Sequence, residues 1–409
     1  MKPSHIPFNK PFVIGKELFY IAQAVMSGTI SGDGMFTKRC QKWLEEQLGC
    51  PKSLLVHSCT AALEMAAMLI DVGHGDEIIM PSFTFVSTAN AFVLRGAVPV
   101  FVDIRPDTLN IDERLIEAAI TPRTKAIVAV HYAGRACAMQ ALQDICRRHK
   151  LHLIEDAAQA ILTEHDGRML GTFGDLGCLS FHETKNVICG EGGALLINNP
   201  ELIERAEILW QKGTNRHAYL RGAVDKYTWV DIGSSFLPSE LTAAFLFAQL
   251  EQAESVIAHR RQLHAKYHEL LRPLEHDGRI ELPVLNGDYA HNAHLFYVLC
   301  KDIEERTELI QHLGERSISA VFHYVPLHDS PAGLFFGRAH GELPVTQNVS
   351  ARLLRLPVYA EMTGQDVERV ADAVRDFYVA RSSGSTVRSS RDIAALNNTS
   401  IHETATSPL

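Results

Sequence analysis

Two short apolar runs with a lysine between them stand out in the segment Gly174-Asp-Leu-Gly-Cys-Leu-Ser-Phe-His-Glu-Thr-Lys185-Asn-Val-Ile-Cys-Gly-Glu-Gly-Gly-Ala-Leu-Leu-Ile197. The runs 176–181 and 194–197 are predicted to be β-strands, and Lys185 falls in the polar, glycine-rich turn that joins them. Most lysines in turns are ordinary solvated side chains. A lysine held at a strand end can differ, because burial and neighbouring charges lower its pKa and free its amine to form a Schiff base with a carbonyl group.

A second element, Leu153-Ile-Glu-Asp156-Ala-Ala-Gln159, lies upstream of this lysine. Here an apolar strand ends in an acidic pair and passes into small residues. Pyridoxal phosphate requires such a pair of groups: a lysine carries its aldehyde, and an aspartate keeps its pyridine nitrogen protonated so that the ring accepts electrons. Asp156 and Lys185 together therefore predict a pyridoxal-phosphate site.

The composition is that of an ordinary globular protein, with 46% hydrophobic and 21% charged residues in a chain of 409 that is long enough for two domains. A net charge of −9 without any basic cluster argues against nucleic-acid binding. The eight cysteines have no zinc-ligand spacing, so we expect no metal site and reduced thiols in a cytoplasmic protein. The sequence predicts neither a signal peptide nor a membrane span.

Strands and helices alternate along the chain, which predicts crossover units and a mostly parallel sheet. The expected strands are 53–56, 77–80, 98–103, 126–130, 152–155, 176–181 and 194–197, and the expected helices are 16–26, 36–48, 61–70, 113–119, 139–150 and 200–210. In such sheets ligands bind at the carboxyl ends of the strands. The turn 57–60, Phe85, His131, Asp156 and Lys185 follow strands and are expected to converge there.

The turn His57-Ser-Cys-Thr60 joins a strand to a helix rich in Ala, Leu and Met. Free N–H groups and the helix dipole favour a phosphate at such a point. Simple N-capping of the helix by Ser58 or Thr60 is the alternative, and it needs no ligand. The glycine-punctuated loop 27–34 does not match the dinucleotide-binding pattern, so it is either a plain connection or a substrate contact.

A change of organisation is expected near residue 250. Residues 1–250 would form an N-terminal arm and a large domain, and residues 251–380 a small C-terminal α/β domain. That domain would contain strands 295–300 and 318–322 and helices 303–313, 345–354 and 365–378. Segment 381–409 is rich in Ser, Thr and Asn and lacks aromatic residues, so we expect a disordered tail.

With these residues assembled, the chain resembles the sugar-nucleotide aminotransferase (DegT) family of fold-type-I pyridoxal-phosphate enzymes over about 5–378. The most specific motifs are Ser58-Cys-Thr-Ala-Ala-Leu-Glu-Met, Pro81-Ser-Phe-Thr-Phe-Val-Ser-Thr-Ala-Asn-Ala, Glu155-Asp-Ala-Ala-Gln, Ser180-Phe-His-Glu-Thr-Lys-Asn and Gly190-Glu-Gly-Gly-Ala. Within the family it is most similar to the dTDP-4-amino-4,6-dideoxygalactose transaminases, in His182-Glu-Thr-Lys-Asn, Asp225-Lys-Tyr-Thr-Trp, Asp231-Ile-Gly-Ser-Ser-Phe and Ala320-Val-Phe-His-Tyr-Val-Pro-Leu-His.

The resemblance implies a large domain with a mostly parallel seven-stranded sheet flanked by helices, a small C-terminal α/β domain, and a homodimer with shared active sites. It also implies roles for single residues. Lys185 is similar to the family's Schiff-base lysine, and Asp156 to the partner of the pyridine nitrogen. Gln159 is similar to the residue near the cofactor's phenolic oxygen, and Phe85 to the aromatic residue that stacks on the ring.

Three residues, Thr60, Ala61 and Ser180, match phosphate-binding positions of the family. At Ser235 many members have an asparagine that reaches the phosphate from the other subunit, and this sequence departs from the family there.

The implied reaction is a transamination, in which glutamate donates an amino group to the 4-keto group of a nucleotide-linked 4-keto-6-deoxyhexose. We expect dTDP-4-dehydro-6-deoxy-D-glucose as acceptor and dTDP-4-amino-4,6-dideoxy-D-galactose as product, for lipopolysaccharide or another surface polysaccharide. The candidate contacts with the sugar nucleotide are Thr29, Ser31, Arg221, Lys226, His323 and Tyr324. Arg352 and Arg355 are assigned to the solvated surface of the helix that leads to Leu356-Pro357.

Three alternatives remain open. A sugar-nucleotide dehydratase of the same fold is the nearest, and members with that chemistry lack the lysine found at position 185. A non-catalytic pyridoxal-phosphate-binding regulatory module is the second. In a structural protein without cofactor, the third alternative, Asp156 and Lys185 would form a plain ion pair.

Overall fold

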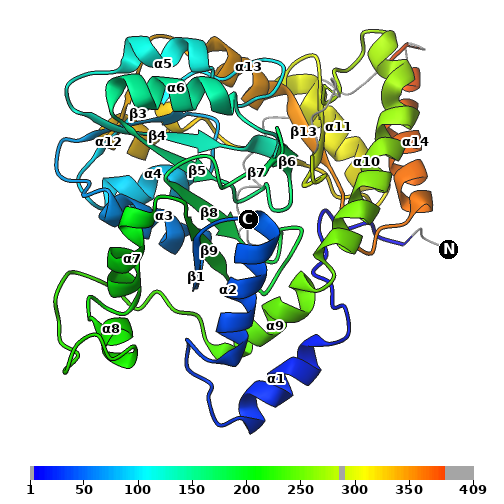
Figure 1. Cartoon of the computed structure of the whole chain (residues 1–409). Coiled ribbons are helices and arrows are strands. Elements are labelled where there is room, and N and C mark those ends of the chain that lie inside the picture. Colours follow the sequence, from blue (N-terminus) through cyan, green and yellow to red (C-terminus); the bar gives the residue numbers. More distant parts are fainter. Residues whose placement is uncertain (1–3, 285–290, 383–409) are drawn as a thin grey trace.

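Eight strands form the main sheet of the computed structural model, which describes residues 4–284 and 291–382 (Figure 1). In sheet order they are β1 (Lys52–Val56), β9 (Gly193–Ile197), β8 (Leu176–Ser180), β5 (His152–Asp156), β4 (Thr124–Val130), β2 (Glu77–Pro81), β3 (Val98–Val102) and β12 (Arg338–Ala339). Strand β9 is antiparallel to both of its neighbours, and every other pair is parallel. The mostly parallel sheet predicted from the sequence is confirmed.

The sheet has one strand more than the seven expected. The additional strand, β12, comes from the C-terminal part of the chain and pairs with β3 through Arg338 and Ala339. A strand of two residues is too short to carry a hydrophobic period, so the sequence pattern could not predict it.

Helices cover both faces of the main sheet (Figure 1). On one face lie α3 (Cys59–Leu69), α4 (Val86–Val93) and α7 (Ile203–Trp210), and on the other α2 (Met35–Leu48), α5 (Glu113–Ala119), α6 (Met139–His149) and α9 (Glu240–Leu250). Side chains of β4 alternate between the faces, with Val128 packing on the first and Ile127 on the second. Because both faces are buried, the strands appear in the sequence as continuous apolar runs.

The shorter elements lie at the margins of this body. They are α1 (Glu17–Met26), β6 (Glu164–His165), β7 (Arg168–Met169), α8 (Arg216–Leu220) and α12 (Pro331–Phe336). Across residues 4–284 and 291–382, no helix has the length and apolar character that crossing a membrane requires.

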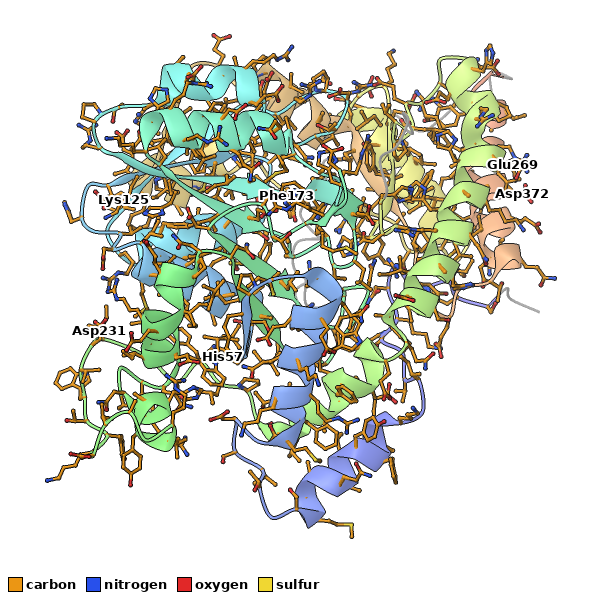
Figure 2. All side chains as sticks on the ribbon, viewed as in Figure 1. His57, Lys125, Phe173, Asp231, Glu269 and Asp372 are labelled. Carbon is orange, nitrogen blue, oxygen red and sulfur yellow. The ribbon has the colours of Figure 1, made fainter. Side chains whose placement is uncertain are left out.

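The C-terminal region contains a second, antiparallel sheet of β10 (Phe296–Leu299), β13 (Leu353–Leu356) and β11 (Val321–Phe322). Helices α10 (Ala253–His276), α11 (Ile303–Glu315) and α14 (Gly364–Ser382) pack against it through one apolar cluster. Glu269 and Asp372 mark the exposed outer sides of α10 and α14 (Figure 2).

The end of α13 (Pro344–Arg352) corrects the sequence prediction of a helix over 345–354. Residues 353–356 form β13, the middle strand of the second sheet, which pairs with β10 on one side and β11 on the other. Arg355 therefore lies on a strand rather than on a helix surface. Local pattern favoured a helix here, but pairing on both sides selects the strand.

Both ends of the described chain pack on the C-terminal region. The N–H of Ile6 donates to the carbonyl of Ser317 (2.9 Å), so the N-terminal arm lies against this part of the protein. At the other end α14 continues to Ser382, past the expected start of the tail, and Arg381 forms ion pairs with Glu305 and Glu308. Of the disordered tail predicted for 381–409, residues 381 and 382 are therefore helical, and residues 383–409 lie outside those that the structure describes.

A buried carboxylate, that of Glu155 in β5, joins the strand to the segment that leads into β8. Its Oε1 accepts hydrogen bonds from the N–H groups of Phe173 (2.6 Å) and Gly174 (2.7 Å), and its Oε2 accepts one from Gly171 (2.8 Å). His131 Nε2, at the end of β4, lies 2.8 Å from Oε2. The path of the chain into β8 thus depends on one carboxylate.

The substitution Glu155→Gln tests this dependence. An amide presents N–H groups where the backbone donors need an acceptor, so we expect the free energy of unfolding to fall by about 3–5 kcal/mol. Urea unfolding followed by circular dichroism measures the change. Glu164→Gln, on the exposed hairpin of β6 and β7, is the matched control and should change stability by less than about 0.5 kcal/mol.

Candidate active site

The carboxyl ends of β1, β2, β4, β5 and β8 lie at one edge of the main sheet, together with the start of β9. The turn 57–60, Asp156 and the loop 181–192 therefore converge, as the sequence predicts. His131 also lies at this edge, but it is fully buried against Glu155, so its role is structural.

Lys185 lies in the loop between β8 and β9, which is fixed on both sides. Its own N–H donates to the carbonyl of His182 (2.9 Å). The next residue, Asn186, is buried, and its Nδ2 donates to the carbonyl of Asn292 in the C-terminal region (2.7 Å). The Oδ1 of Asn186 lies 3.1 Å from Nδ1 of His294. The loop is thereby held at a defined position against the C-terminal region.

The amine of Lys185 is available for chemistry. Within residues 4–284 and 291–382 its Nζ forms no hydrogen bond and no ion pair. Burial lowers the pKa of Lys185 below its usual value, and the charge of Arg355 acts in the same direction, while Cys59 and Asp156 oppose the shift. A lysine amine with a lowered pKa is more often neutral, which is the form that attacks a carbonyl carbon.

Asp156 is the last residue of β5, and two donors fix its carboxylate. Thr88 Oγ1, in the first turn of α4, donates to Oδ2 (2.7 Å), and the N–H of Ala158 donates to Oδ1 (3.2 Å). Asp156 and Lys185 are near enough for the carboxylate to act on the pKa of the amine, yet they form no direct ion pair. The plain ion pair of a purely structural protein is therefore absent between these two described residues.

Gln159 connects the main sheet to the loop that follows β11. Its Oε1 accepts a hydrogen bond from the N–H of Ala133 (2.7 Å), and its Nε2 donates to the hydroxyl of Tyr324 (2.8 Å). The ring of Tyr324 stacks on that of His323, with centroids 3.7 Å apart. The Nδ1 of His323 lies 2.7 Å from the hydroxyl of Tyr132, and burial lowers the pKa of His323 well below its usual value. The two predicted sugar contacts thus form one aromatic cluster with Tyr132, in which Tyr132 and His323 are buried and Tyr324 is partly exposed.

The start of α3 presents backbone N–H groups at the same edge. The side chain of Ser58 accepts a hydrogen bond from the N–H of Ala61 (3.1 Å). Ser58 is therefore an N-cap residue, as one of the two interpretations of the sequence predicted. The N–H groups of Cys59 and Thr60 precede the first intrahelical bond and remain available to an anion. β9 passes very close here: a Cβ at Gly193 would lie 2.5 Å from Cys59 N, so only glycine fits.

The other predicted site residues lie in different surroundings. Ser180 is buried at the end of β8, and Phe85 is exposed at the start of α4, whereas Phe83 packs beneath Tyr132 and Tyr324. Thr29, Ser31, Lys226 and Ser235 are exposed in loops outside this cluster.

Arg221 forms an ion pair with Glu207 (2.7 Å) rather than joining the cluster. The loops 27–34 and 212–236 are nevertheless neighbours, because His217 of the second lies 3.3 Å from Asp33 of the first. The sequence analysis named residues of both loops as candidate substrate contacts, but it did not predict that the two loops lie next to each other.

Sequence reasoning missed Thr88, Tyr132, Asn292 and Arg355. Thr88 and Tyr132 could have been predicted as site residues, because both come shortly after the ends of strands that the sequence analysis had assigned. Asn292 lies in an irregular segment with no pattern, and the wrong helix assignment concealed Arg355. Among residues 4–284 and 291–382, no three His, Cys, Asp or Glu side chains are grouped as metal ligands would be.

Comparison with known proteins matches residues 13–375 to the DegT/DnrJ/EryC1/StrS aminotransferase family. The chain belongs to this family. It is 34% identical over 380 residues to the spore coat polysaccharide biosynthesis protein SpsC of Bacillus subtilis (strain 168), covering 91% of this chain and 96% of SpsC. The crystal structure of the aminotransferase TlmJ from Streptoalloteichus hindustanus superposes with a TM-score of 0.85 at 30% identity, over 92% of this chain and 100% of TlmJ.

A third relative bears on the cofactor. The PLP-form of the sugar aminotransferase Spr1654 from Streptococcus pneumoniae superposes with a TM-score of 0.84 at 25% identity, over 91% of this chain and 98% of that one. The protein is therefore a DegT-family aminotransferase that acts on sugars, has the fold-type-I architecture and uses pyridoxal phosphate. The available Lys185 amine, the fixed Asp156 carboxylate and the free N–H groups of α3 fit this cofactor.

Labelling tests the place of Lys185. Purified protein loaded with pyridoxal phosphate should be yellow, and borohydride reduction should attach the cofactor's mass to the peptide that contains Lys185. Lys185→Ala should abolish turnover, because the amine is lost, while Lys42→Ala on the exposed surface of α2 should leave it unchanged. A label on any other lysine would contradict the assignment.

Proposed function

We propose that this aminotransferase transfers the amino group of glutamate to C4 of a nucleotide-linked 4-keto-6-deoxyhexose. The acceptor would be dTDP-4-dehydro-6-deoxy-D-glucose, and the product dTDP-4-amino-4,6-dideoxy-D-galactose. The observation that carries the proposal is the aromatic cluster of Tyr132, His323 and Tyr324, of which Tyr324 is partly exposed. SpsC is named for spore coat polysaccharide biosynthesis, which supports a product used in a surface polysaccharide.

The chemistry of this cluster suits a sugar. Aromatic faces pack on the apolar face of a sugar ring, and neutral hydroxyl and imidazole groups exchange hydrogen bonds with its hydroxyls. Burial keeps His323 neutral, because it lowers the pKa of the imidazole well below its usual value. A neutral ring can both donate and accept, as sugar hydroxyls require.

The proposed residue roles rest on the family resemblance, and the geometry supports them. When bound, pyridoxal phosphate supplies an aldehyde carbon and an electron-accepting ring. Lys185 would hold that carbon, Asp156 would hold the ring nitrogen, and the start of α3 would hold the phosphate. The surrounding positions Thr60, Ala61, Phe85, Gln159 and Ser180 complete this proposed cofactor site.

Lys185 would also move the proton of the reaction. Burial lowers its pKa, so the neutral amine is able to take a proton from the donor's α-carbon and deliver one to C4 of the acceptor. Thr88 and Ala158 fix the direction of the Asp156 carboxylate and so the orientation of whatever it binds.

We also propose a homodimer with shared active sites, formed through the end of the molecule that carries α1 and α8, at the bottom of Figure 1. Large apolar side chains are exposed on this end: Leu18, Phe19, Val25, Met26, Tyr219, Leu220, Tyr227, Trp229, Val230 and Ile232. Exposed apolar groups in such number are typical of protein interfaces. Arg221, Lys226 and Ser235 lie outside their own chain's cluster, which supports their serving the partner's site.

The dimer is tested by a matched pair of leucines. Leu18 on α1 is 76% exposed and Leu334 on α12 is 71% exposed. We expect Leu18→Asp to shift the protein from dimer to monomer in analytical ultracentrifugation and to reduce activity with it, because a charge is buried at the interface. Leu334→Asp should leave the dimer intact. A wild-type monomer would contradict the proposal.

The sugar assignment is tested on the two half-reactions separately by stopped-flow absorbance. His323→Ala combined with Tyr324→Phe should slow the half-reaction with the nucleotide sugar on the order of 10- to 100-fold and spare the one with glutamate, because in this proposal the sugar contacts these side chains and glutamate does not. His340→Ala, at the end of β12, is the control and should change neither. Equal losses in both half-reactions would refute the contact.

A further inference from the structure

Arg355 is an arginine held in place but without a counter-charge. It lies in the middle of β13, where its Nη2 donates to the carbonyl of Phe322 (3.2 Å) and its Cζ lies 4.8 Å from the centre of the Phe8 ring. Its Nε is buried and has no hydrogen-bond partner. Within residues 4–284 and 291–382 no carboxylate forms an ion pair with it.

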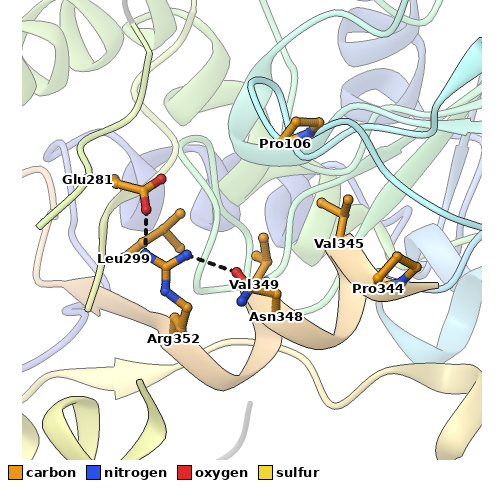
Figure 3. Close-up of a pocket in the computed structure, with 8 residues that line it drawn as sticks. All are labelled: Pro106, Glu281, Leu299, Pro344, Val345, Asn348, Val349 and Arg352. Carbon is orange, nitrogen blue, oxygen red and sulfur yellow. Dashed lines mark hydrogen bonds and ion pairs between the residues drawn. The ribbon is translucent and has the colours of Figure 1, made fainter. Parts of the chain in front are cut away.

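Arg352, three residues earlier in the sequence and at the end of α13, shows how an arginine is usually paired. It contacts the carboxylate of Glu281 and the side chain of Asn348, and all three residues line a pocket between α13 and β10 (Figure 3). Its Nε donates to the carbonyl of Cys300 (2.6 Å). The side chain of Arg352 thus has a carboxylate partner within the protein, whereas Arg355 donates only to a backbone carbonyl and its Nε has no partner.

Arg355 lies on the face of β13 that is turned toward the active site, because its cross-strand partner on β10 is Tyr297, whose ring centre lies 6.2 Å from that of Tyr132 in the cluster that also contains Tyr324. Its charge acts on Lys185 and His323 and helps to lower the pKa of each, after burial, and the hydroxyls of Tyr132 and Tyr324 are near enough to act on Arg355 in turn. Burial also lowers the pKa of Arg355 itself. The usual pKa of an arginine is so high, however, that the guanidinium keeps its charge. A partly buried charge without a partner is costly unless a bound anion offsets it.

We propose that Arg355 binds the α-carboxylate of the amino donor. This proposal rests on the proposed function in one respect, namely that the amino donor is an amino acid. The planar fork of an arginine matches a carboxylate with two parallel hydrogen bonds. Phe8 covers one face of the guanidinium and the Phe322 carbonyl takes one donor, which leaves an edge suited to one small planar anion rather than a diphosphate.

The donor's carboxylate at Arg355 and the cofactor's phosphate at the start of α3 would bind at different places. The free N–H groups of Cys59 and Thr60 lie at the start of α3, on the β1 side of the sheet, whereas Arg355 lies in the C-terminal region beside Tyr324. Lys185 lies within electrostatic reach of both Cys59 and Arg355. A donor whose carboxylate contacts Arg355 would therefore direct its amino group toward Lys185, where the reaction takes place.

Binding of glutarate, which has carboxylates but no amino group to react, tests the proposal directly. Isothermal titration calorimetry on the cofactor-loaded protein should show that Arg355→Gln weakens glutarate binding on the order of 10- to 100-fold. Arg352→Gln is the matched control and should bind glutarate like the wild type. If Arg355→Gln does not fold, Arg355→Lys keeps the charge but loses the fork, and should weaken binding by a smaller factor.

The half-reactions provide a second readout. With glutamate, glutamine and alanine as separate donors, Arg355→Gln should raise the half-saturating concentration of every donor that the wild type accepts and leave the half-reaction with the nucleotide sugar unchanged. Unchanged glutarate binding, or equal loss in both half-reactions, would overturn the proposal. A wild type that reacts with amino acids but with no nucleotide sugar would refute the proposed acceptor and leave the test of Arg355 intact.

Discussion

Two adjacent carboxylates at the end of β5 set the geometry on which the rest of the protein depends. Successive side chains of a strand point to opposite faces, so Glu155 and Asp156 reach different surroundings. Glu155 accepts hydrogen bonds from the backbone of 171–174 and thereby fixes the entry to β8. Asp156 points to the side of α4, where Thr88 orients it. One residue pair therefore both builds the scaffold and equips the site.

The C-terminal region completes the site through buried polar contacts. Asn292 donates to the carbonyls of Gln159 and Ile161, and its own carbonyl accepts from Asn186 next to the lysine. Buried amides of this kind are costly unless every group is paired, so they hold the parts in a single arrangement. The position of Lys185 is consequently determined by the main sheet and the C-terminal region together.

The electrostatics of the site differ from those of the whole chain. The chain carries a net charge of −9, yet Lys185 and Arg355 bring two basic groups to the site, and burial lowers the pKa of His294 and of His323, which keeps both imidazoles neutral. A small site with cationic donors and few fixed anions is suited to phosphate and carboxylate ligands. The same surroundings lower the pKa of Lys185 and so favour its reactive neutral form.

The sequence by itself determined the alternation of strands and helices, the parallel sheet, and the convergence of Asp156, Lys185 and the turn 57–60, because buried strands and strand ends leave a local pattern. Tertiary structure alone decided the rest. Residues 353–356 are a strand because two neighbours pair with them, and this pairing turns Arg355 toward the site. Asn186 meets Asn292 across a long stretch of chain. Contacts of this kind depend on how distant segments pack, and no local period records them.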